Sequence, residues 1–324
     1  MKMLTTLFAA SAIAALAPVS AAYAQTFPAQ PVRIVVPYTA GGPADVLARA
    51  LGQQLSQKWG QPVIVENRPG ANEIIAAQEV ARAPADGYTY LIASDAVFSL
   101  NKYLYSKIPY APEDFVPVSK LVTANLMLVA RPDLPVKTTA ELVDYAKKNP
   151  GKLNYTSVGA GGVNHLAMAW FNNLNQLDMQ HVPYKGLAQA LQDIGGGRAD
   201  LGFAVIGGAL PMLQNGKVKG LAVAGKTRSA IAPDVPTFAE AGYPQFDASF
   251  YFAVAAPKGS PAAAVHKFAK DAGDIVRSAE FKQRYLTNLG FEAVGDTPED
   301  FAGFLVQDRD LAEKKVKVSG AKLD

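Results

Sequence analysis

The strongest constraint on the fold is a repeated alternation of short, β-rich apolar runs with amphipathic helical segments. The first unit has an apolar run at 32–37, a loop at 38–42 and a helical pattern that begins near Pro43. Leu47, Leu51 and Leu55 recur at helical spacing, and a proline in the first turn is a typical helix start. This alternation predicts an α/β protein with parallel or mixed sheets flanked by helices.

A second unit of the same kind occurs far downstream. An apolar run at 153–156 precedes a glycine-rich loop at 157–162 and a helical pattern with Leu166, Trp170 and Leu174. Because the two units lie so far apart in a chain of 324 residues, we expect one in each of two lobes. Ligands of open parallel sheets bind beyond the carboxyl ends of the strands, so the sequence predicts a ligand cleft between the lobes.

The remaining elements follow the same patterns. Further strands are expected at 63–66, 88–93, 126–130, 181–184, 201–204, 220–224 and 250–256, and further helices near 70–83, 142–148, from 187, at 261–289 and at 298–311. Aromatic residues and prolines favour a connector at 101–117. The predicted first lobe comprises 25–124 with 248–324, and the second comprises 125–247.

The N-terminus has the pattern of an export signal. Lys2 precedes a mostly apolar stretch at 4–16, and the small-x-small sequence Ala22-Tyr23-Ala24 predicts cleavage near Ala24. The apolar stretch is well short of the roughly 20 residues that span a bilayer. We therefore expect residues 1–24 to be a removed signal peptide and the mature protein to be exported, with an uncleaved anchor as the alternative.

The composition argues against several kinds of site. The chain has no cysteine, so disulfides, thiol nucleophiles and lipid attachment through cysteine do not arise. Its three histidines, His165, His181 and His266, do not stand at metal-ligand spacing, so we expect no metal and no cofactor. The formal net charge of +3 is spread along the chain and favours no nucleic-acid partner.

The two glycine loops predict an anion site. Each loop can present backbone N–H groups at a helix start, where glycine permits close approach and the helix dipole favours negative charge. The candidate ligand-binding residues are Tyr38, Thr39, Ala40, Gly41, Gly42 and Asp45 in the first loop, Ser157, Gly159, Ala160, Gly161 and His165 in the second, and Ser94, Asp95 and Tyr184 at strand ends. Structural roles stay open for Asp45 as a first-turn cap, for His165 as a buried histidine, and for Ser94 and Asp95 as turn residues.

Several segments, in a fixed order, cover nearly the whole mature chain. They are PVRIVVPYTAGGPAD at 31–45, VENRPGA at 65–71, DGYT at 86–89, PGKLNY at 150–155, HVPYKG at 181–186, and DVPT at 234–237 with EAG at 240–242. Together they resemble the Bug-type substrate-binding proteins of tripartite tricarboxylate transporters, and the combined match is highly specific.

This resemblance implies a two-lobed periplasmic-binding-protein fold of type II-like organisation, located in the periplasm. It implies a small carboxylate ligand, a di- or tricarboxylate or an aromatic carboxylate, held largely by backbone amides of the loops at 38–45 and 157–165. It also implies docking on a small membrane component and a large permease. We expect the protein to act as a monomer.

The sequence departs from the family pattern in two places. Asn72-Glu73-Ile74 stand where family members commonly have Gly-Gly-Asn or Gly-Gly-Thr, and Ala204 stands at an expected cleft-facing strand end where many have aspartate. The missing carboxylate at Ala204 favours a ligand without an amine, aromatic carboxylates included, although Glu73 could partly replace the missing charge.

Enzyme patterns in the chain are incomplete. Residues 159–164 lack the last glycine of a dinucleotide-binding fingerprint. Ser157 lacks the preceding glycine of a nucleophile elbow, and the sequence shows no well-placed base. Ser99 and Lys102 match a Ser-x-x-Lys motif by spacing alone. We therefore expect a binding protein and no enzyme, with a ligand-sensing module and, more remotely, an exported hydrolase as alternatives.

Overall fold

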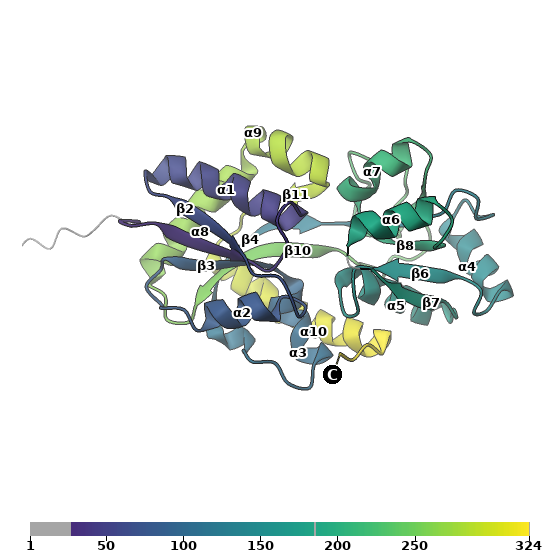
Figure 1. The fold of residues 1–324 in the computed structure, drawn as a ribbon, viewed down its shortest axis with the longest axis horizontal. Helices are drawn as coiled ribbons and strands as arrows, with labels where there is room; N and C mark the ends of the chain where they lie inside the picture. The colour runs from purple at the N-terminus through teal and green to yellow at the C-terminus, as the bar shows by residue number, and fades with distance from the viewer. Residues whose placement is uncertain (1–26, 185, 324) are drawn as a thin grey trace, which may run out of the picture.

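The computed structural model describes residues 27–184 and 186–323, and the predicted signal peptide lies outside them. The chain forms two lobes, each built around its own β-sheet (Figure 1). The predicted two-lobed α/β fold is confirmed.

The sheet of the first lobe has the strand order β11-β4-β10-β3-β1-β2. Strand β1 pairs in parallel with β2 and β3, whereas β10 runs antiparallel to both β3 and β4. The strands are β1 (Val32–Val36), β2 (Val63–Asn67), β3 (Thr89–Ser94), β4 (Phe115–Ala124), β10 (Phe250–Pro257) and β11 (Phe291–Ala293). The parallel half of this sheet directs the carboxyl ends of β1 and β3 toward the second lobe (Figure 1).

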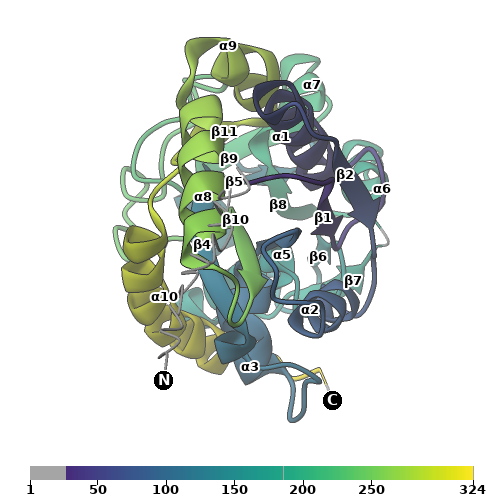
Figure 2. The same cartoon turned by 90° about the vertical axis from the view of Figure 1, so that its left-hand side faces the viewer.

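Helices cover both faces of this sheet (Figure 2). Helices α1 (Pro43–Trp59) and α8 (Ala262–Arg277) cover one face, and α2 (Ile74–Ala81) and α10 (Pro298–Ser319) cover the other. Side chains alternate across a strand, so Ile34 and Val36 pack toward α1 while Val35 packs toward α2. Both faces are therefore buried, which explains the continuously apolar strand sequences.

Short helical segments complete the first lobe. They are η1 (Ala96–Leu100), α3 (Asn101–Leu104), η2 (Pro112–Asp114), α9 (Ala279–Phe281), η3 (Lys282–Leu286) and η4 (Thr287–Leu289).

The sheet of the second lobe has the order β7-β6-β8-β5-β9. Strand β6 pairs in parallel with β7 and β8, and β5 runs antiparallel to β8 and β9. The elements are β5 (Leu126–Ala130), α4 (Thr139–Lys148), β6 (Asn154–Ser157), α5 (Val163–Asn175), β7 (Gln180–Pro183), α6 (Leu187–Gly195), β8 (Leu201–Val205), α7 (Ile206–Gln214) and β9 (Lys219–Val223). Strand β6 and helix α5 thus repeat the β1–α1 arrangement of the first lobe.

The chain crosses between the lobes at two places, after β4 and before β10. Only Asn125 separates β4 from β5, and its side-chain amide donates to Glu292 Oε1 at 3.1 Å. Helix α10 also joins the lobes through packing, because Ala312 and Val316 contact Leu166 of α5. The lobe limits of 25–124 with 248–324 and 125–247 stay a prediction, supported by the strands that each sheet contains.

Parts of the secondary structure differ from expectation. Residues 101–117 are not a simple connector, because they contain α3 and η2 and the start of β4. Pro117 and Lys120 are unusual residues for a strand, so the sequence did not indicate β4. Strand β11 pairs only with residues 122–124, so Pro117 lies where β4 is a sheet edge and needs no N–H donor on that side. Helix α7 escapes prediction because it contains two glycines and Pro211.

Candidate ligand-binding site

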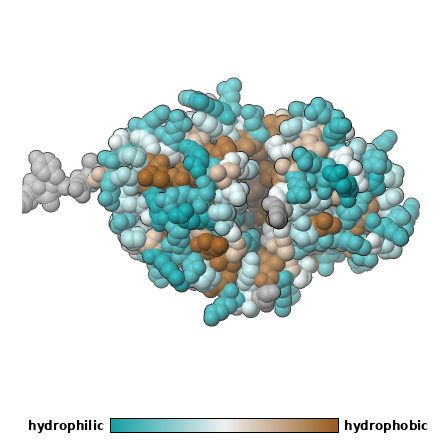
Figure 3. Space-filling model, in the orientation of Figure 1, coloured by the Kyte–Doolittle hydropathy of each residue, from teal (hydrophilic) through white to brown (hydrophobic). Residues whose placement is uncertain are grey.

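A cavity of about 560 Å³ lies between the lobes. Its lining combines the loops at the carboxyl ends of β1 and β6 with the aromatic side chains of Phe250, Phe252 and Phe291. Figure 3 shows the hollow between the lobes, with hydrophobic residues inside it. The volume and the apolar walls are those of a small-molecule site.

The first loop joins β1 to α1. The backbone N–H of Gly41, which has a φ of 84°, donates to Asp45 Oδ2 at 2.9 Å, and that of Gly42 donates to the carbonyl of Thr39 at 3.4 Å. The first-turn N–H groups of a helix have no partner within the helix, and no side chain caps those of α1. Thr39, Gly42 and Ala44 line the cavity at this helix start.

The second loop, between β6 and α5, repeats this geometry. Gly161 has a φ of 76°, and its N–H donates to His165 Nδ1 at 3.1 Å, as Gly41 does to Asp45. The N–H of Gly162 donates to the carbonyl of Gly159 at 3.4 Å, and no side chain caps α5. Gly159, Gly162 and other residues of this loop line the same cavity, so two helix N-termini meet at one cleft.

Asp45 and His165 serve these loops as acceptors. Asp45, 2% exposed, also accepts from Arg49 Nε at 3.0 Å and from Asn67 Nδ2 at 2.8 Å. Burial raises the pKa of Asp45, but these hydrogen bonds outweigh it and hold the pKa below its usual value. Burial and the nearby His181 lower the pKa of His165 to about 4, which suits a neutral ring that accepts from Gly161.

The structure brings some of the candidate residues to the cavity and places others behind it. Those that line it are Tyr38, Thr39, Gly42, Ser94, Gly159 and Ala160; those outside its lining are Ala40, Gly41, Asp45, Asp95, Ser157, Gly161, His165, Tyr184 and Ala204. Tyr184, for example, donates to Asp193 Oδ2 at 2.8 Å, and Gly161 lies against Leu323. Ligand contact stays a prediction for all of these residues.

Ala204 does not face the cleft as expected. Successive side chains of β8 point to opposite faces of the sheet, and Ala204 packs with Met127 and Val129 in the core of the second lobe, 1% exposed. Its neighbour Val205 lines the cavity instead. The expectation of a ligand without an amine, which relied on Ala204, therefore loses its basis.

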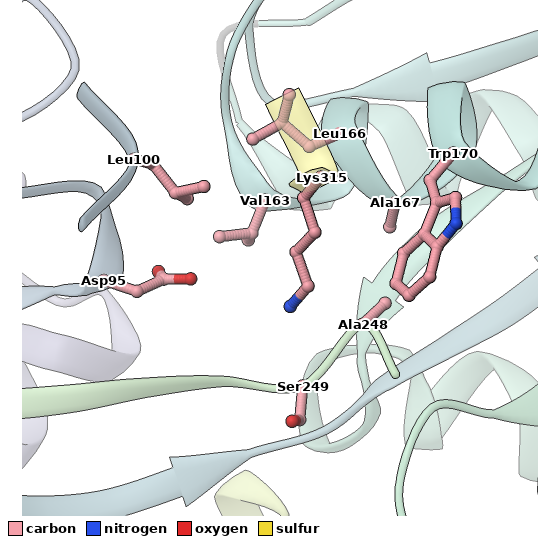
Figure 4. Close-up of a pocket in the computed structure, with 9 residues that line it drawn as sticks. All are labelled: Asp95, Leu100, Val163, Leu166, Ala167, Trp170, Ala248, Ser249 and Lys315. Atoms are coloured by element: carbon pink, nitrogen blue, oxygen red, sulfur yellow. The ribbon is translucent and has the colours of Figure 1, made fainter. Parts of the chain in front are cut away.

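Asp95 lies in a separate, small cavity of about 20 Å³ beside α10. In Figure 4 its carboxylate points toward the ammonium group of Lys315, with Ser249 on the other side. Burial raises the pKa of Asp95 well above its usual value, the nearby Asp308 raises it further, and Lys315 opposes the shift. This small cavity has residues of both lobes in its lining, and it is distinct from the main cavity.

A serine–histidine pair that the sequence did not reveal lies behind the second loop. Strands β6 and β7 bring Ser157 Oγ within 2.7 Å of His181 Nε2, so a base does stand beside this serine. Ser157 Oγ also accepts from the N–H of Gly159 at 3.1 Å, and Ser157 is 2% exposed. The serine is hydrogen-bonded to Gly159 of the loop, and neither Ser157 nor His181 lines the cavity.

Glu73 is a cavity residue outside the candidate set. It ends a run of three non-glycine residues with positive φ, at 47°, 49° and 73° for Ala71, Asn72 and Glu73. Such a conformation costs on the order of 1 kcal/mol or more for each residue. Asn101 holds the turn, because its amide donates to the Asn72 carbonyl at 2.9 Å and accepts from Asn72 Nδ2 at 2.7 Å. The only signal in the sequence was the departure from glycine at these positions.

Glu73 also defines the charge of the cavity. It is the only acidic residue among the described residues that line the cavity, and none of them is lysine, arginine or histidine. No group of side chains in the described part of the chain could hold a metal ion, and no helix there is long and apolar enough to cross a membrane. An anion in this cavity would therefore be held by backbone N–H groups and neutral side-chain donors such as Thr39.

Two lobes on separate sheets, with opposed helix N-termini at the cleft between them, define a solute-binding protein. Residues 47–318 match the family described as the tripartite tricarboxylate transporter family receptor, and the chain belongs to this family. Its members are periplasmic receptors, which confirms the predicted Bug-type resemblance.

Similarity to individual relatives extends over most of the chain. Protein BugT of Bordetella pertussis is 34% identical over 309 residues, which cover 95% of this chain and 94% of BugT. The structure of R. palustris Rpa4515 with adipate is 33% identical, with a TM-score of 0.84, and covers 92% of this chain and 100% of its own. MatC from Rhodopseudomonas palustris with bound malate is 32% identical, with a TM-score of 0.80, covering 90% and 100%.

Proposed function

We propose that this receptor captures a small carboxylate in the periplasm and delivers it to the membrane subunits of a tripartite tricarboxylate-type transporter. The observation that carries this proposal is the pair of matched loops, whose free N–H groups at the starts of α1 and α5 meet at one cavity. Backbone donors at helix N-termini hold a carboxylate without a basic side chain. The adipate and malate in the two similar structures agree with a ligand of this class.

The proposal includes export of the protein and action as a monomer. The leader at 1–24, cut near Ala24, would release the protein into the periplasm, where it acts as a monomer that docks on a small and a large membrane component. Membership in a receptor family supports docking. A sensing role would use the same cleft and a different docking partner.

We propose further that the protein is not an enzyme. Among the described residues, the Ser157–His181 pair is the feature that favours a hydrolase, but neither residue lines the cavity, and the serine hydroxyl is hydrogen-bonded to His181 and to the loop. Ser157 is 2% exposed, which argues against attack by its hydroxyl on a ligand in the cavity.

The test is a binding and turnover experiment on the mature chain. Purified protein is titrated calorimetrically with aliphatic and aromatic carboxylates, and each mixture is then followed by NMR for product. We expect saturable binding of at least one carboxylate, a raised unfolding temperature and no product. Absence of binding across the panel would refute carboxylate capture, and product in excess over protein would refute the non-enzymatic role.

A further inference from the structure

The Glu73 carboxylate is fixed at the cavity wall by donors from two other strand ends. Its Oε1 accepts hydrogen bonds from the hydroxyls of Tyr38 and Ser94, and its Oε2 accepts from the backbone N–H of Ser94 at 3.0 Å. Tyr38 follows β1 and Ser94 ends β3, so the carboxylate sits where the two strands end. With 7% of its surface exposed, Glu73 cannot turn away into bulk water.

These hydrogen bonds leave capacity for one more donor. A carboxylate has about four lone-pair sites, and three of those on Glu73 are occupied. The remaining capacity is on Oε2, on a residue that lines the cavity. Burial raises the pKa of Glu73 above its usual value, while the hydrogen bonds from Ser94 and Tyr38 favour the ionised form. Because all three of its partners are donors, the geometry places Glu73 as a hydrogen-bond acceptor in the cavity wall.

The rest of the cavity gives this acceptor a selective effect. No cationic side chain of the described lining offsets its charge. A second carboxylate on a ligand would meet a like charge on a buried side chain, where such repulsion is stronger than in open water. An N–H or O–H group at the same point would complete the hydrogen bonding of Oε2 and lose little on leaving water.

The body of the ligand lies between these two polar ends. Phe250, Phe252 and Phe291 line the cavity, and the ring of Phe252 packs edge-on against that of Tyr38 with centroids 5.7 Å apart. Such walls favour an aliphatic chain or a ring.

We propose that Glu73 determines specificity: the site takes a monocarboxylate whose far end carries an N–H or O–H donor, and it discriminates against the matching dicarboxylate. This inference rests on the proposed carboxylate-binding function. The same geometry explains why a strained left-handed turn is retained at 71–73, since it aims Glu73 at the cavity.

The experiment compares ligands that differ only at the far end. An aliphatic series contains adipate, its monoamide, 6-hydroxyhexanoate, 6-aminohexanoate and hexanoate; an aromatic series contains terephthalate, 4-carbamoylbenzoate, 4-(hydroxymethyl)benzoate, 4-(aminomethyl)benzoate and 4-methylbenzoate. Dissociation constants are measured calorimetrically at pH 7.5 for the wild type, Glu73→Gln and Glu113→Gln. Glu113 lies in the same lobe on the surface, paired with Arg309 at 3.7 Å, and controls for the loss of one negative charge.

In at least one series, we expect a donor-bearing ligand to bind the wild type at least tenfold more tightly than the dicarboxylate. Glu73→Gln should bring the two within about threefold, and Glu113→Gln should keep the wild-type ratio. A stronger response of the ammonium ligand than of the amide and hydroxyl to Glu73→Gln would show that charge dominates over hydrogen bonding. Circular dichroism melting checks the fold of both variants.

Two results would overturn the inference. One is a wild type that binds the dicarboxylate as tightly as every donor-bearing ligand in both series, a ranking that needs no variant. The other is a folded Glu73→Gln protein with the wild-type preference. Failure of all carboxylates to bind the wild type is a different result, because it would refute the proposed function itself.

Discussion

Replacing Val163 with proline tests the backbone N–H groups at the start of α5. Val163 is the first residue of α5, as Pro43 is of α1, so the chain already tolerates proline at the equivalent place. Proline would delete one N–H that has no helix partner. The preceding residue, Gly162, has a φ of −66° and a ψ of 158°, which is the conformation favoured before proline. The substitution should therefore preserve the fold and remove a single ligand donor.

The expected loss follows from the chemistry of that donor. A hydrogen bond to a charged group contributes about 1.5–3 kcal/mol. Since about 1.4 kcal/mol is tenfold in affinity, the dissociation constant should rise by about 10- to 100-fold. The matched control is Val163→Ala, which trims the side chain at the cavity and keeps the N–H.

The assay is calorimetric titration of both variants and the wild type with the tightest carboxylate of the panel. Val163→Pro should bind at least tenfold more weakly than Val163→Ala, with unfolding temperatures that agree within a few degrees. Equal dissociation constants for the two variants, with both proteins folded, would refute backbone capture of the carboxylate by α5.

Three further expectations concern stability. The pKa of His165 is about 4 in the folded protein, below its usual 6.5, so between these values the unfolded chain binds one more proton at this residue. The free energy of unfolding should therefore fall as the pH drops from 6.5 to 4. Urea titrations should show a smaller fall for His165→Gln. Asp271 is buried, which by itself would raise its pKa. Hydrogen bonds from Lys58, from Trp59 Nε1 at 2.7 Å and from Lys267 outweigh burial and lower the pKa to about 2. Asp271→Asn should therefore cost about 1–2 kcal/mol at pH 7, with a difference that shrinks below about pH 4, and a constant difference down to pH 2 would contradict this assignment. Asn101→Ala should lower the free energy of unfolding by about 1–3 kcal/mol and weaken ligand binding, because it removes the hydrogen bonds that hold the turn before Glu73. Chemical denaturation measures the first effect and calorimetry the second. Unchanged affinity would show that the turn does not need Asn101.

Sequence patterns located the strands and helices where local chemistry is decisive. The β1–loop–α1 unit was predicted because apolar β-rich residues, a glycine pair and Pro43 each favour the same local conformation. Strand β4 was missed because Pro117 and Lys120 contradict its local pattern, and its pairing with β10 and β11 makes it a strand.

The candidate site was predicted in part, for a related reason. Glycine-rich loops can be recognised from composition, so the sequence predicted Gly42 and Gly159, and both line the cavity. Ala204 was misplaced because its direction depends on which face of β8 meets the core, and a one-residue change reverses that direction. The Ser157–His181 pair was missed because pairing of β6 with β7 creates it.

By itself, the sequence determined the α/β class, the two glycine loops and the family, because these depend on residue type and short-range order along the chain. Only the tertiary structure decided that Glu73 meets Tyr38 and Ser94 at one wall, since the three residues come from separate segments. Strand pairing and packing bring such segments together, and no local preference encodes the direction in which a buried side chain then points. The charge of the cleft, and with it the class of ligand, is therefore a property of the assembled fold.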